Sequence, residues 1–450
     1  MSSPGKPVLL LSVAIALIFV LGVGCDGDPV PSESPPANRV LIIGIDGASY
    51  RIIEPMMRTG RLPNLARIAK EGVYGPIISS DLPLLSPRIW TTVATGKKAP
   101  KHGIYQWVRK TSEGLARLNY SFDRESHAIW NILSDRGKTV GVVNWLTTYP
   151  PEVVQGVIVS SHAFPAEVDG KVFLGEMFAG VDGRKLEPVD RGRGRGSAIS
   201  PEDWNERVLD EHHAEATLTE VANPFLADQS IATMTFTVET MSRWYNTDER
   251  FVSIAKEIQK EERPDLMMVL LQGIDRTSHA LWAGVEKPTA YDSEKRWSPE
   301  RIAKARKAIE GYYHFSDALI GVLLEDVGPN DLVIVMSDHG FEAPKPGTKV
   351  GTGAHYSDAA RNGVFFARGR DIRVGVGTDE LTIADVTPTV LAWLGIPIGE
   401  DMDGKPGAFL EIPPVPPIPT HDTTEILRLE AESGTDESIL KELKELGYIE

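Results

Sequence analysis

Three aspartates and three histidines carry the clearest chemical signal in this sequence. Each follows a short apolar run or lies in a glycine-rich loop that comes after one. They are Asp46, Asp275, His279, Asp338, His339 and His355. One aspartate or histidine at such a position is usually a helix cap or a hydrogen-bonded polar residue. As a set, the six carboxylates and imidazoles are enough to hold two divalent metal ions, and they favour zinc over calcium.

Hydrophobic patterns predict the elements that must position these residues. Four continuous apolar runs have the length of strands, at 40–45, 140–144, 266–271 and 332–336. Such a run is typical of a strand buried on both faces, as in a parallel sheet covered by helices. Segments with helical spacing precede the last three runs, at 126–137, 249–260 and 298–322. We therefore expect a doubly wound α/β fold, a mostly parallel sheet with helices on both faces and a ligand crevice at the carboxyl ends of the strands.

The segment around Ser86 supplies a candidate nucleophile. Residues 83–96 read Pro-Leu-Leu-Ser-Pro-Arg-Ile-Trp-Thr-Thr-Val-Ala-Thr-Gly, and the pattern predicts a helix over 89–94. A hydroxyl near a helix N-terminus meets free backbone N–H groups and the positive end of the helix dipole, which favour an alkoxide or a bound phosphate oxygen. A serine followed by proline is also an ordinary helix cap. The local sequence alone favours the cap.

Composition excludes several classes of protein. The chain has 450 residues, of which 42% are hydrophobic, and this is typical of globular rather than disordered proteins. Its 47 basic and 63 acidic residues give a net charge of −16, so we expect no binding of nucleic acid polymers. The single cysteine, Cys25, excludes an intramolecular disulfide and a metal site built from cysteines.

The N-terminal segment resembles a bacterial lipoprotein signal. Lys6 precedes an apolar stretch over 8–24, and an acidic, proline-rich stretch follows Cys25. These features are typical of an export signal, in which the cysteine would carry the lipid. The lipoprotein pattern prefers leucine three residues before the cysteine, whereas Gly22 stands there and Leu21 comes one residue earlier. An uncleaved anchor helix and an ordinary signal peptide are the alternatives to an exported, membrane-anchored lipoprotein in the periplasm or on the outer surface.

The same composition shifts divide the chain into parts. We expect a signal peptide over 1–25, a proline-rich linker over 26–38, a catalytic domain over 39–412, and a proline-rich segment with a C-terminal helix over 413–450. Residues 160–245 show no convincing strand and are interpreted as a cap-like insertion in the catalytic domain. An Arg-Gly repeat at 190–196 could bind anions, but a solvated loop is the favoured interpretation.

Six motifs occur in a fixed order along the chain. They are Ile-Gly-Ile-Asp46-Gly, Ser86-Pro-x-x-Trp with a later Thr-Gly and His-Gly-Ile, Asp275-x-x-x-His279, Ser-Asp338-His339-Gly, Gly-x-His355 and Asp385-Val-Thr-Pro-Thr-Val-Leu. In kind and order they resemble the alkaline phosphatase superfamily, most closely its type I phosphodiesterase/nucleotide pyrophosphatase family. The resemblance spans residues 39 to about 407 and implies an alkaline-phosphatase-like fold.

The resemblance also implies a role for each residue. One metal ion would be held by Asp275, His279 and His355, and the other by Asp46, Asp338 and His339. Ser86 would be the nucleophile and form a phosphoseryl enzyme that water hydrolyses. The implied activity is metal-dependent hydrolysis of phosphate esters, chiefly phosphodiester or pyrophosphate bonds, in a small-molecule, lipid or glycan substrate.

Two departures from the family pattern bear on the substrate. Eukaryotic-type pyrophosphatases carry threonine as the nucleophile and an asparagine three residues later that holds a phosphate oxygen, where this chain has Ser86 and Ile89. Arg88 and Lys97 are the candidates to replace that contact. Sulfatases of the superfamily need cysteine or serine followed by x-Pro-x-Arg, and Ser86-Pro87-Arg88 has a different spacing.

Three other functions remain as alternatives. A phosphomonoesterase of the same superfamily would use the same site, and a transferase would pass a phosphoryl-linked head group to a lipid or glycan. A binding protein that has lost catalysis is disfavoured, because the expected residue type stands at all seven positions.

The lipoprotein interpretation predicts that the mature protein starts at a lipidated Cys25 and partitions into detergent. Replacing Cys25 with serine removes the thiol that accepts the lipid, so the variant should be released from the membrane or keep its signal peptide. Phase partitioning and intact-mass analysis measure this outcome. A Cys25→Ser protein that stays membrane-bound at the processed mass would contradict the interpretation.

Overall fold

The computed structural model describes Met1 and residues 38–79, 82–110, 116–161, 204, 217–226, 228–232, 236–345 and 352–427. Apart from Met1 and residue 38, the predicted signal peptide and linker lie outside the described residues, as do most of the predicted insertion and the predicted C-terminal helix. None of the described helices is both long enough and apolar enough to cross a lipid bilayer.

A seven-stranded sheet forms the centre of the domain, in the strand order β2-β9-β8-β1-β7-β5-β6. Its strands are β1 (Val40–Ile45), β2 (Val73–Ile78), β5 (Val140–Val143), β6 (Gly156–Val159), β7 (Leu266–Leu271), β8 (Leu332–Met336) and β9 (Asn362–Arg368). The five strands from β8 to β6 are parallel, and β9 runs antiparallel to both of its neighbours. The mostly parallel sheet is therefore confirmed, and all four predicted strands lie where the apolar runs placed them. A separate two-stranded sheet pairs β3 (Val108–Lys110) with β4 (Ala116–Leu118) in antiparallel fashion.

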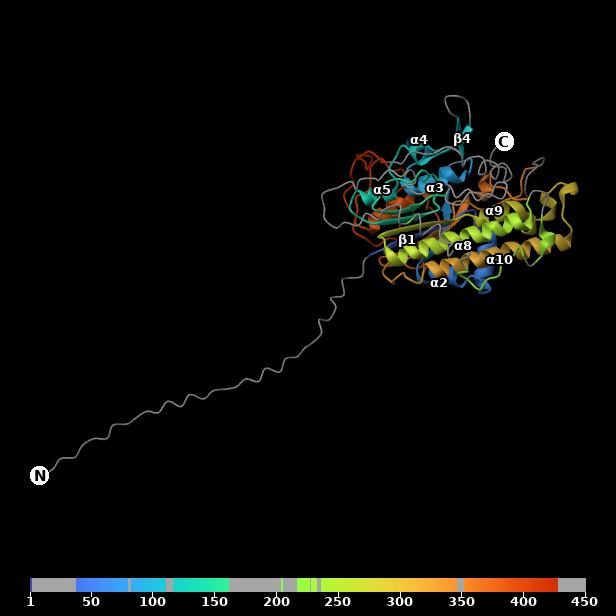
Figure 1. The fold of residues 1–450 in the computed structure, drawn as a ribbon, viewed down its shortest axis with the longest axis horizontal. Coiled ribbons are helices and arrows are strands. Elements are labelled where there is room, and N and C mark those ends of the chain that lie inside the picture. Colours follow the sequence, from blue (N-terminus) through green and yellow to red (C-terminus); the bar gives the residue numbers. More distant parts are fainter. Residues whose placement is uncertain are drawn as a thin grey trace. The chain divides into compact units, whose positions relative to one another are not determined.

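Helices cover both faces of this sheet, as Figure 1 shows. One face carries α1 (Tyr50–Arg58), α2 (Pro63–Glu71), α8 (Val238–Glu261), α9 (Gly273–Leu281) and α10 (Pro299–Leu323). The other carries α3 (Ser86–Thr95), α4 (Ala99–His102), α5 (Ile129–Ser134) and α11 (Val386–Trp393). The predicted doubly wound α/β architecture is confirmed. The helix predicted over 126–137 is present as the shorter α5.

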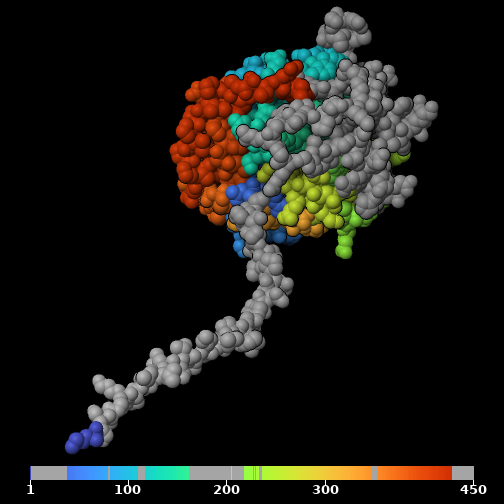
Figure 2. All heavy atoms as spheres, turned by 60° about the vertical axis from the view of Figure 1, so that its left-hand side comes forward, coloured from blue at the N-terminus to red at the C-terminus, as the bar shows by residue number. Residues whose placement is uncertain are grey.

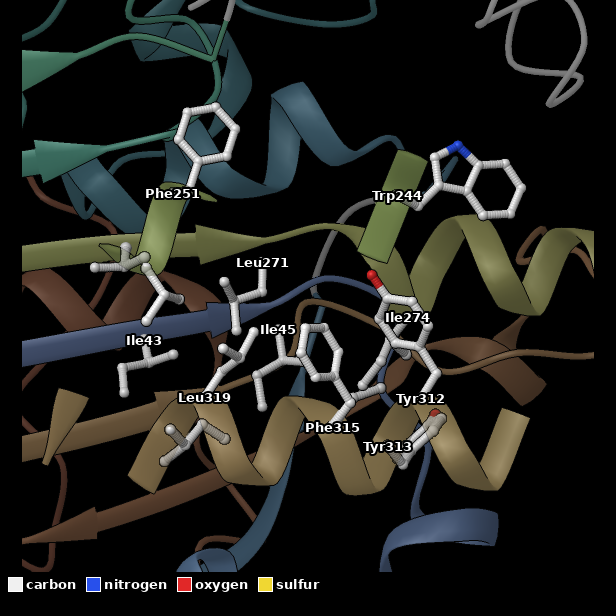
Figure 3. Close-up of a cluster of buried hydrophobic side chains, with 14 of the residues drawn as sticks. Ile43, Ile45, Trp244, Phe251, Leu271, Ile274, Tyr312, Tyr313, Phe315 and Leu319 are labelled. Atoms are coloured by element: carbon white, nitrogen blue, oxygen red, sulfur yellow. The ribbon is translucent and has the colours of Figure 1, made fainter. Parts of the chain in front are cut away.

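The central strand β1 is buried on both faces, which explains its continuous apolar run. Ile43 is 0% exposed and belongs to a cluster with side chains of α8 and α10, including Phe251 and Phe315 (Figure 3). Ile42 is 1% exposed and points into a second cluster with Trp90 of α3. Successive strand residues point to opposite faces, so each face needs its own apolar partners.

Helix α8 begins earlier than its sequence pattern predicted. We expected a helix over 249–260, but α8 starts at Val238, inside the segment interpreted as an insertion. The Thr237 side chain caps it by accepting a hydrogen bond from the Thr240 N–H. Met241 and Trp244 of the first turns are buried and extend the apolar stripe of the later turns. The tertiary core therefore lengthens the helix toward its N-terminus.

Residues 397–427, here called the C-terminal strap, lie outside helices and strands and pack beside residues 97–153. Figure 2 shows this red end of the chain against the cyan and green residues. Side chains hold it in place, since the Asp422 carboxylate accepts hydrogen bonds from His127 and the Thr424 hydroxyl donates to Asp135. The Val153 N–H also donates to the Leu427 carbonyl.

Burial of β1 on both faces predicts the effect of two neighbouring substitutions. Ile42→Ala and Ile43→Ala should each lower the free energy of unfolding by about 2–5 kcal/mol, because each leaves a cavity in a different cluster. Leu226→Ala should change it by less than about 0.5 kcal/mol, because Leu226 is 63% exposed. Denaturant unfolding measures all three. A near-neutral result for either isoleucine would show that one face of β1 is open to solvent.

Candidate active site

The carboxyl ends of three adjacent parallel strands bring the predicted ligands together. Asp46 directly follows β1, and Asp338 and His339 follow β8 after one serine. Helix α9 starts two residues after β7 and carries Asp275 and His279 on one side, four residues apart. Because β8, β1 and β7 are neighbours in one parallel array, these residues meet at a single edge of the sheet.

His339 lies in the middle of the resulting cluster. Its Nε2 atom is 3.4 Å from an oxygen of Asp338, 3.6 Å from one of Asp46 and 4.0 Å from one of Asp275. Two triads have their potential ligand atoms within 4.8 Å of one another: Asp46 with Asp338 and His339, and Asp275 with His339 and His355. The first triad matches one predicted ligand set. The second contains His339 where the predicted set has His279.

His279 nevertheless lies close to the second triad. Its Nε2 atom is 3.2 Å from Nε2 of His355 and 3.6 Å from a carboxylate oxygen of Asp275. The rings of His339 and His355 stack with their centroids 3.8 Å apart. All six predicted ligands are thus brought together, and their division between two ions stays a prediction.

Backbone carbonyls fix the orientation of all three imidazoles. His279 Nδ1 donates to the Gly353 carbonyl at 3.0 Å, His339 Nδ1 to the Gly340 carbonyl at 3.0 Å, and His355 Nδ1 to the Leu84 carbonyl at 2.9 Å. A carbonyl oxygen only accepts, so Nδ1 must carry the proton and the neutral ring keeps a lone pair on Nε2. Metal-binding histidines are usually held in this way. Sequence analysis missed these contacts because a backbone carbonyl has no residue-type signature.

Burial works against charge on four of these side chains. It raises the pKa of Asp46 well above its usual value, and the neighbouring Asp338 and Asp275 carboxylates add to the increase. Burial also raises the pKa of Asp338. In the opposite sense, burial lowers the pKa of His279 and His355, and His339 adds to both shifts. A divalent cation would reverse these effects, because it stabilises carboxylates and neutral imidazoles together.

Several buried polar atoms of the cluster have no hydrogen-bond partner among the described residues. They are one carboxylate oxygen each of Asp46 and Asp338, Nε2 of His339 and Oγ of Ser86. Buried polar atoms are nearly always paired, and an ion is one of the recognised reasons for an exception. A lone-pair donor set of carboxylate, imidazole and hydroxyl fits a divalent metal, and nitrogen with oxygen favours zinc. The residues present therefore fit the predicted metal site.

Ser86 is not the cap of helix α3. The N-cap residue is Leu85, and Ser86 is the first helical residue with a side chain that is 0% exposed. Its neighbours tie it to the cluster from both sides, because the Leu84 carbonyl accepts from His355 and the Trp90 indole N–H donates to Asp46 at 3.3 Å. This geometry favours the nucleophile over the cap.

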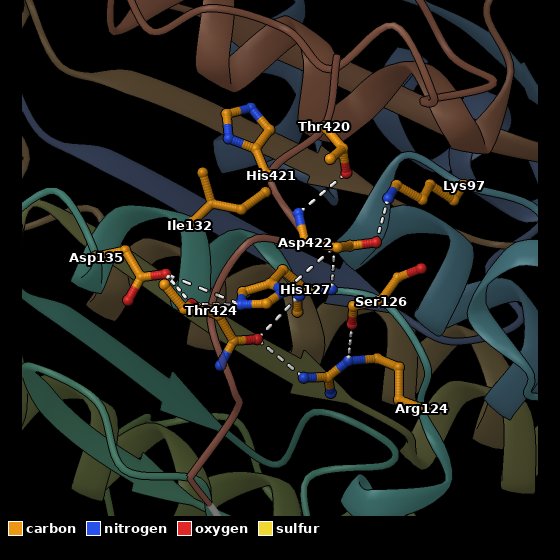
Figure 4. Close-up of polar contacts among 12 residues, drawn as sticks. Lys97, Arg124, Ser126, His127, Ile132, Asp135, Thr420, His421, Asp422 and Thr424 are labelled. Carbon is orange, nitrogen blue, oxygen red and sulfur yellow. Dashed lines mark hydrogen bonds and ion pairs between the residues drawn. The ribbon is translucent and has the colours of Figure 1, made fainter. Parts of the chain in front are cut away.

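The two candidate phosphate-binding cations lie at opposite ends of α3. Arg88 is in the first turn, where its guanidinium donates to the Leu82 carbonyl at 3.0 Å and lies over the Tyr105 ring. Lys97 follows the last turn, about 15 Å from Ser86 along the helix. Its ammonium is 2.5 Å from Asp401 of the C-terminal strap. It is also 2.6 Å from Asp422 of the strap, and Figure 4 shows this second contact. The ammonium of Lys97 is therefore engaged in ion pairs away from the cluster.

Several solved structures are similar to this chain at low sequence identity. A mutant of the alkaline phosphatase PafA is 11% identical, with a TM-score of 0.51 over 83% of this chain and 99% of that one. Murine ectonucleotide pyrophosphatase/phosphodiesterase 5, in complex with AMP, is 13% identical, with a TM-score of 0.47 over 83% and 98%. Phosphonoacetate hydrolase from Sinorhizobium meliloti, in complex with phosphonoacetate, is 13% identical, with a TM-score of 0.46 over 78% and 94%. A second structure of the same hydrolase, in complex with phosphonoformate, is also similar, but this chain spans only 57% of its length.

The sequence comparison identifies the family. No curated protein matches this chain. Residues 40–376 match the model of the type I phosphodiesterase/nucleotide pyrophosphatase family, which is more than half of the chain. That range contains Ser86 and all six predicted ligands. The chain therefore belongs to the type I phosphodiesterase/nucleotide pyrophosphatase family and is a metal-dependent hydrolase of phosphate esters.

Proposed function

We propose that this protein is an exported, lipid-anchored hydrolase that cleaves phosphodiester or pyrophosphate bonds through a phosphoseryl intermediate at a two-metal site. The buried Ser86 hydroxyl carries the proposal. It has no hydrogen-bond partner among the described residues, and it stands at the N-terminus of α3 between two residues that contact the predicted ligands. A hydroxyl in that position is available for attack rather than used for packing.

The chain's own groups support this attack. The first backbone N–H groups of α3 have no partner within the helix, and since Pro87 lacks one, the donors nearest the nucleophile belong to Ser86 and Arg88. Together with the helix dipole they favour a negatively charged phosphoryl oxygen. Bound divalent cations would neutralise phosphoryl charge and lower the pKa of the serine hydroxyl.

The reaction then has two displacements. The Ser86 oxygen forms a bond to phosphorus while the bond from phosphorus to the leaving oxygen breaks, and the hydroxyl proton ends on the leaving group. Water attacks the phosphoserine in the second step, which releases the phosphoryl product and restores the proton on Ser86. Two in-line displacements leave the configuration at phosphorus unchanged.

The charges around Ser86 favour a diester or pyrophosphate over a monoester. A monoester brings an additional negative charge and needs more positive charge at the site. Two of the nearby lysines are bound elsewhere, because Lys97 pairs with Asp401 and Asp422 and Lys101 pairs with Asp403. Arg88 is the cation that stays beside Ser86 along α3.

Ser86→Ala should remove catalysis without weakening the fold. In metal-free protein the free energy of unfolding should stay unchanged or rise, because the lost hydroxyl is buried without a partner. Loss of a true N-cap would lower it by about 1 kcal/mol. The variant should still bind both metal ions, since six other side chains hold them, while turnover falls by orders of magnitude and Ser86→Thr keeps part of it. A metal-loaded Ser86→Ala enzyme with near wild-type turnover would contradict the nucleophile assignment.

Acid quenching should trap a phosphorylated peptide that contains Ser86, and mass spectrometry identifies it. The reaction of a chiral phosphorothioate diester should proceed with retention of configuration at phosphorus. A bis-aryl phosphodiester should be hydrolysed faster than the matching monoester. Faster monoester hydrolysis would indicate a phosphomonoesterase, and phosphoryl products on added acceptor alcohols in place of hydrolysis would indicate a transferase.

Metal analysis tests the two-metal site. The purified protein should hold close to two zinc ions per chain and lose activity to a chelator. His355→Ala should remove one ion and Asp338→Ala the other, because these residues belong to different predicted sets. Zinc content measured after gel filtration reports the result. Unchanged zinc in both variants would contradict the ligand assignment.

A further inference from the structure

His355 is the one predicted ligand that neither lies on a helix nor comes within three residues of the end of a strand. Residues 352–357 form no regular element apart from an isolated bridge at Ala354. A metal ligand must nevertheless be held to within a fraction of an ångström, so neighbouring groups must supply the rigidity that a helix or strand would give.

Part of that support comes from helix α9. The Thr352 and Gly353 N–H groups donate to the His279 carbonyl at 2.7 and 3.1 Å, and the Thr352 hydroxyl donates to the Ala280 carbonyl at 3.0 Å. These bonds fix the residues before His355. The residues after it need a different partner.

Glu342 is that partner. Its backbone exchanges two hydrogen bonds with Ala354, at 2.8 and 2.9 Å. One oxygen of its carboxylate accepts from the N–H groups of Tyr356 and Ser357, at 2.9 and 2.8 Å, and the other accepts from the Ser357 hydroxyl at 2.7 Å. One side chain therefore receives three short, charge-assisted bonds from the two residues that follow His355.

The position of Glu342 along the chain connects the two halves of the cluster. It comes three residues after His339, and Phe341 beside it contacts the rings of His279 and His355. His355 in turn donates to the Leu84 carbonyl, two residues before Ser86. Glu342 thus links the segment that carries His339 to the segment that carries His355. Through His355 it is also linked to the segment before Ser86.

We propose that Glu342 is a positioning residue that holds His355 in its metal-binding orientation and thereby sets the zinc affinity of one of the two sites. This inference rests on the proposed metal site. The Glu342 carboxylate acts through hydrogen bonds to the backbone and not through its charge on the metal. Changes to such supporting partners typically weaken metal binding about 10- to 100-fold.

Three substitutions of Glu342 separate position from charge. Glu342→Gln removes the charge but keeps an oxygen that can accept both N–H groups, so zinc binding should stay within about threefold of wild type. Glu342→Asp keeps the charge but withdraws the carboxylate by about 1.5 Å, one carbon–carbon bond. It should weaken one of the two zinc ions at least tenfold, as should Glu342→Ala, while the other ion stays bound.

Zinc affinity is measured on metal-free protein by competition with a chromophoric chelator. Asp331→Ala is the matched control, because Asp331 also accepts from two backbone N–H groups and one side chain, those of Gly328 and Arg39, but at the opposite end of β8. It should lower thermal stability and leave both zinc affinities unchanged.

The outcomes distinguish this inference from the proposed function. Wild-type protein that binds no zinc, or His355→Ala protein that keeps both ions, would overturn the metal site and the role of Glu342 with it. A wild type with two zinc ions, and Glu342→Asp and Glu342→Ala proteins with the same two affinities, would overturn the role of Glu342 alone. Weak binding in Glu342→Gln with normal binding in Glu342→Asp would overturn it in favour of a direct effect of charge.

Discussion

The burial of three carboxylates beside three imidazoles at one edge of the sheet is the constraint on which the rest of the structure depends. Burial and mutual repulsion raise the pKa of Asp46, and burial lowers the pKa of His279 and His355, so these two imidazoles do not supply the missing positive charge. Without a cation the folded chain holds these groups at a cost in free energy. The two hydrophobic clusters on either side of the sheet must offset that cost.

Each ligand-bearing segment is held by a different device. The segments that follow β1 and β8 are fixed because these strands are part of the central sheet. Helix α9 is fixed at its start by the buried Asp248, whose carboxylate accepts from the Gln272 and Gly273 N–H groups and from the Tyr312 hydroxyl. A Cβ at residue 273 would overlap the Tyr312 hydroxyl, so glycine fits there without displacing the buried Tyr312 ring. Burial raises the pKa of Asp248 to about 6. Asp248 is therefore a further buried polar group, and its hydrogen bonds position the start of α9.

The sequence was most informative where residue type and position act together. The apolar runs predicted β1, β5, β7 and β8, and the residues that follow them predicted the ligand cluster, because parallel strands deliver their carboxyl ends to one edge. Contacts through backbone atoms could not be predicted, which is why the partners of the histidine Nδ1 atoms and the bonds from residues 356–357 to Glu342 were missed. Lys97 was named for its closeness to Ser86 in sequence, but Ser86 begins the ten-residue helix α3 and Lys97 comes after its end.

Helix α3 illustrates that function depends on the residues of the site and not on the fold alone. The same fold carries different chemistries, so the function has to follow from the residues of the site, here those along α3. Its N-terminus is tied to the predicted ligands through Leu84 and Trp90, and its C-terminus is tied to the C-terminal strap through Lys97. Because a helix transmits position as a rigid rod, residues more than 300 positions away in sequence help to set where Ser86 lies. The strap also holds the Lys97 ammonium in ion pairs with Asp401 and Asp422. The positive charge that a substrate would meet near Ser86 therefore depends on tertiary contacts from outside the Ser86 motif.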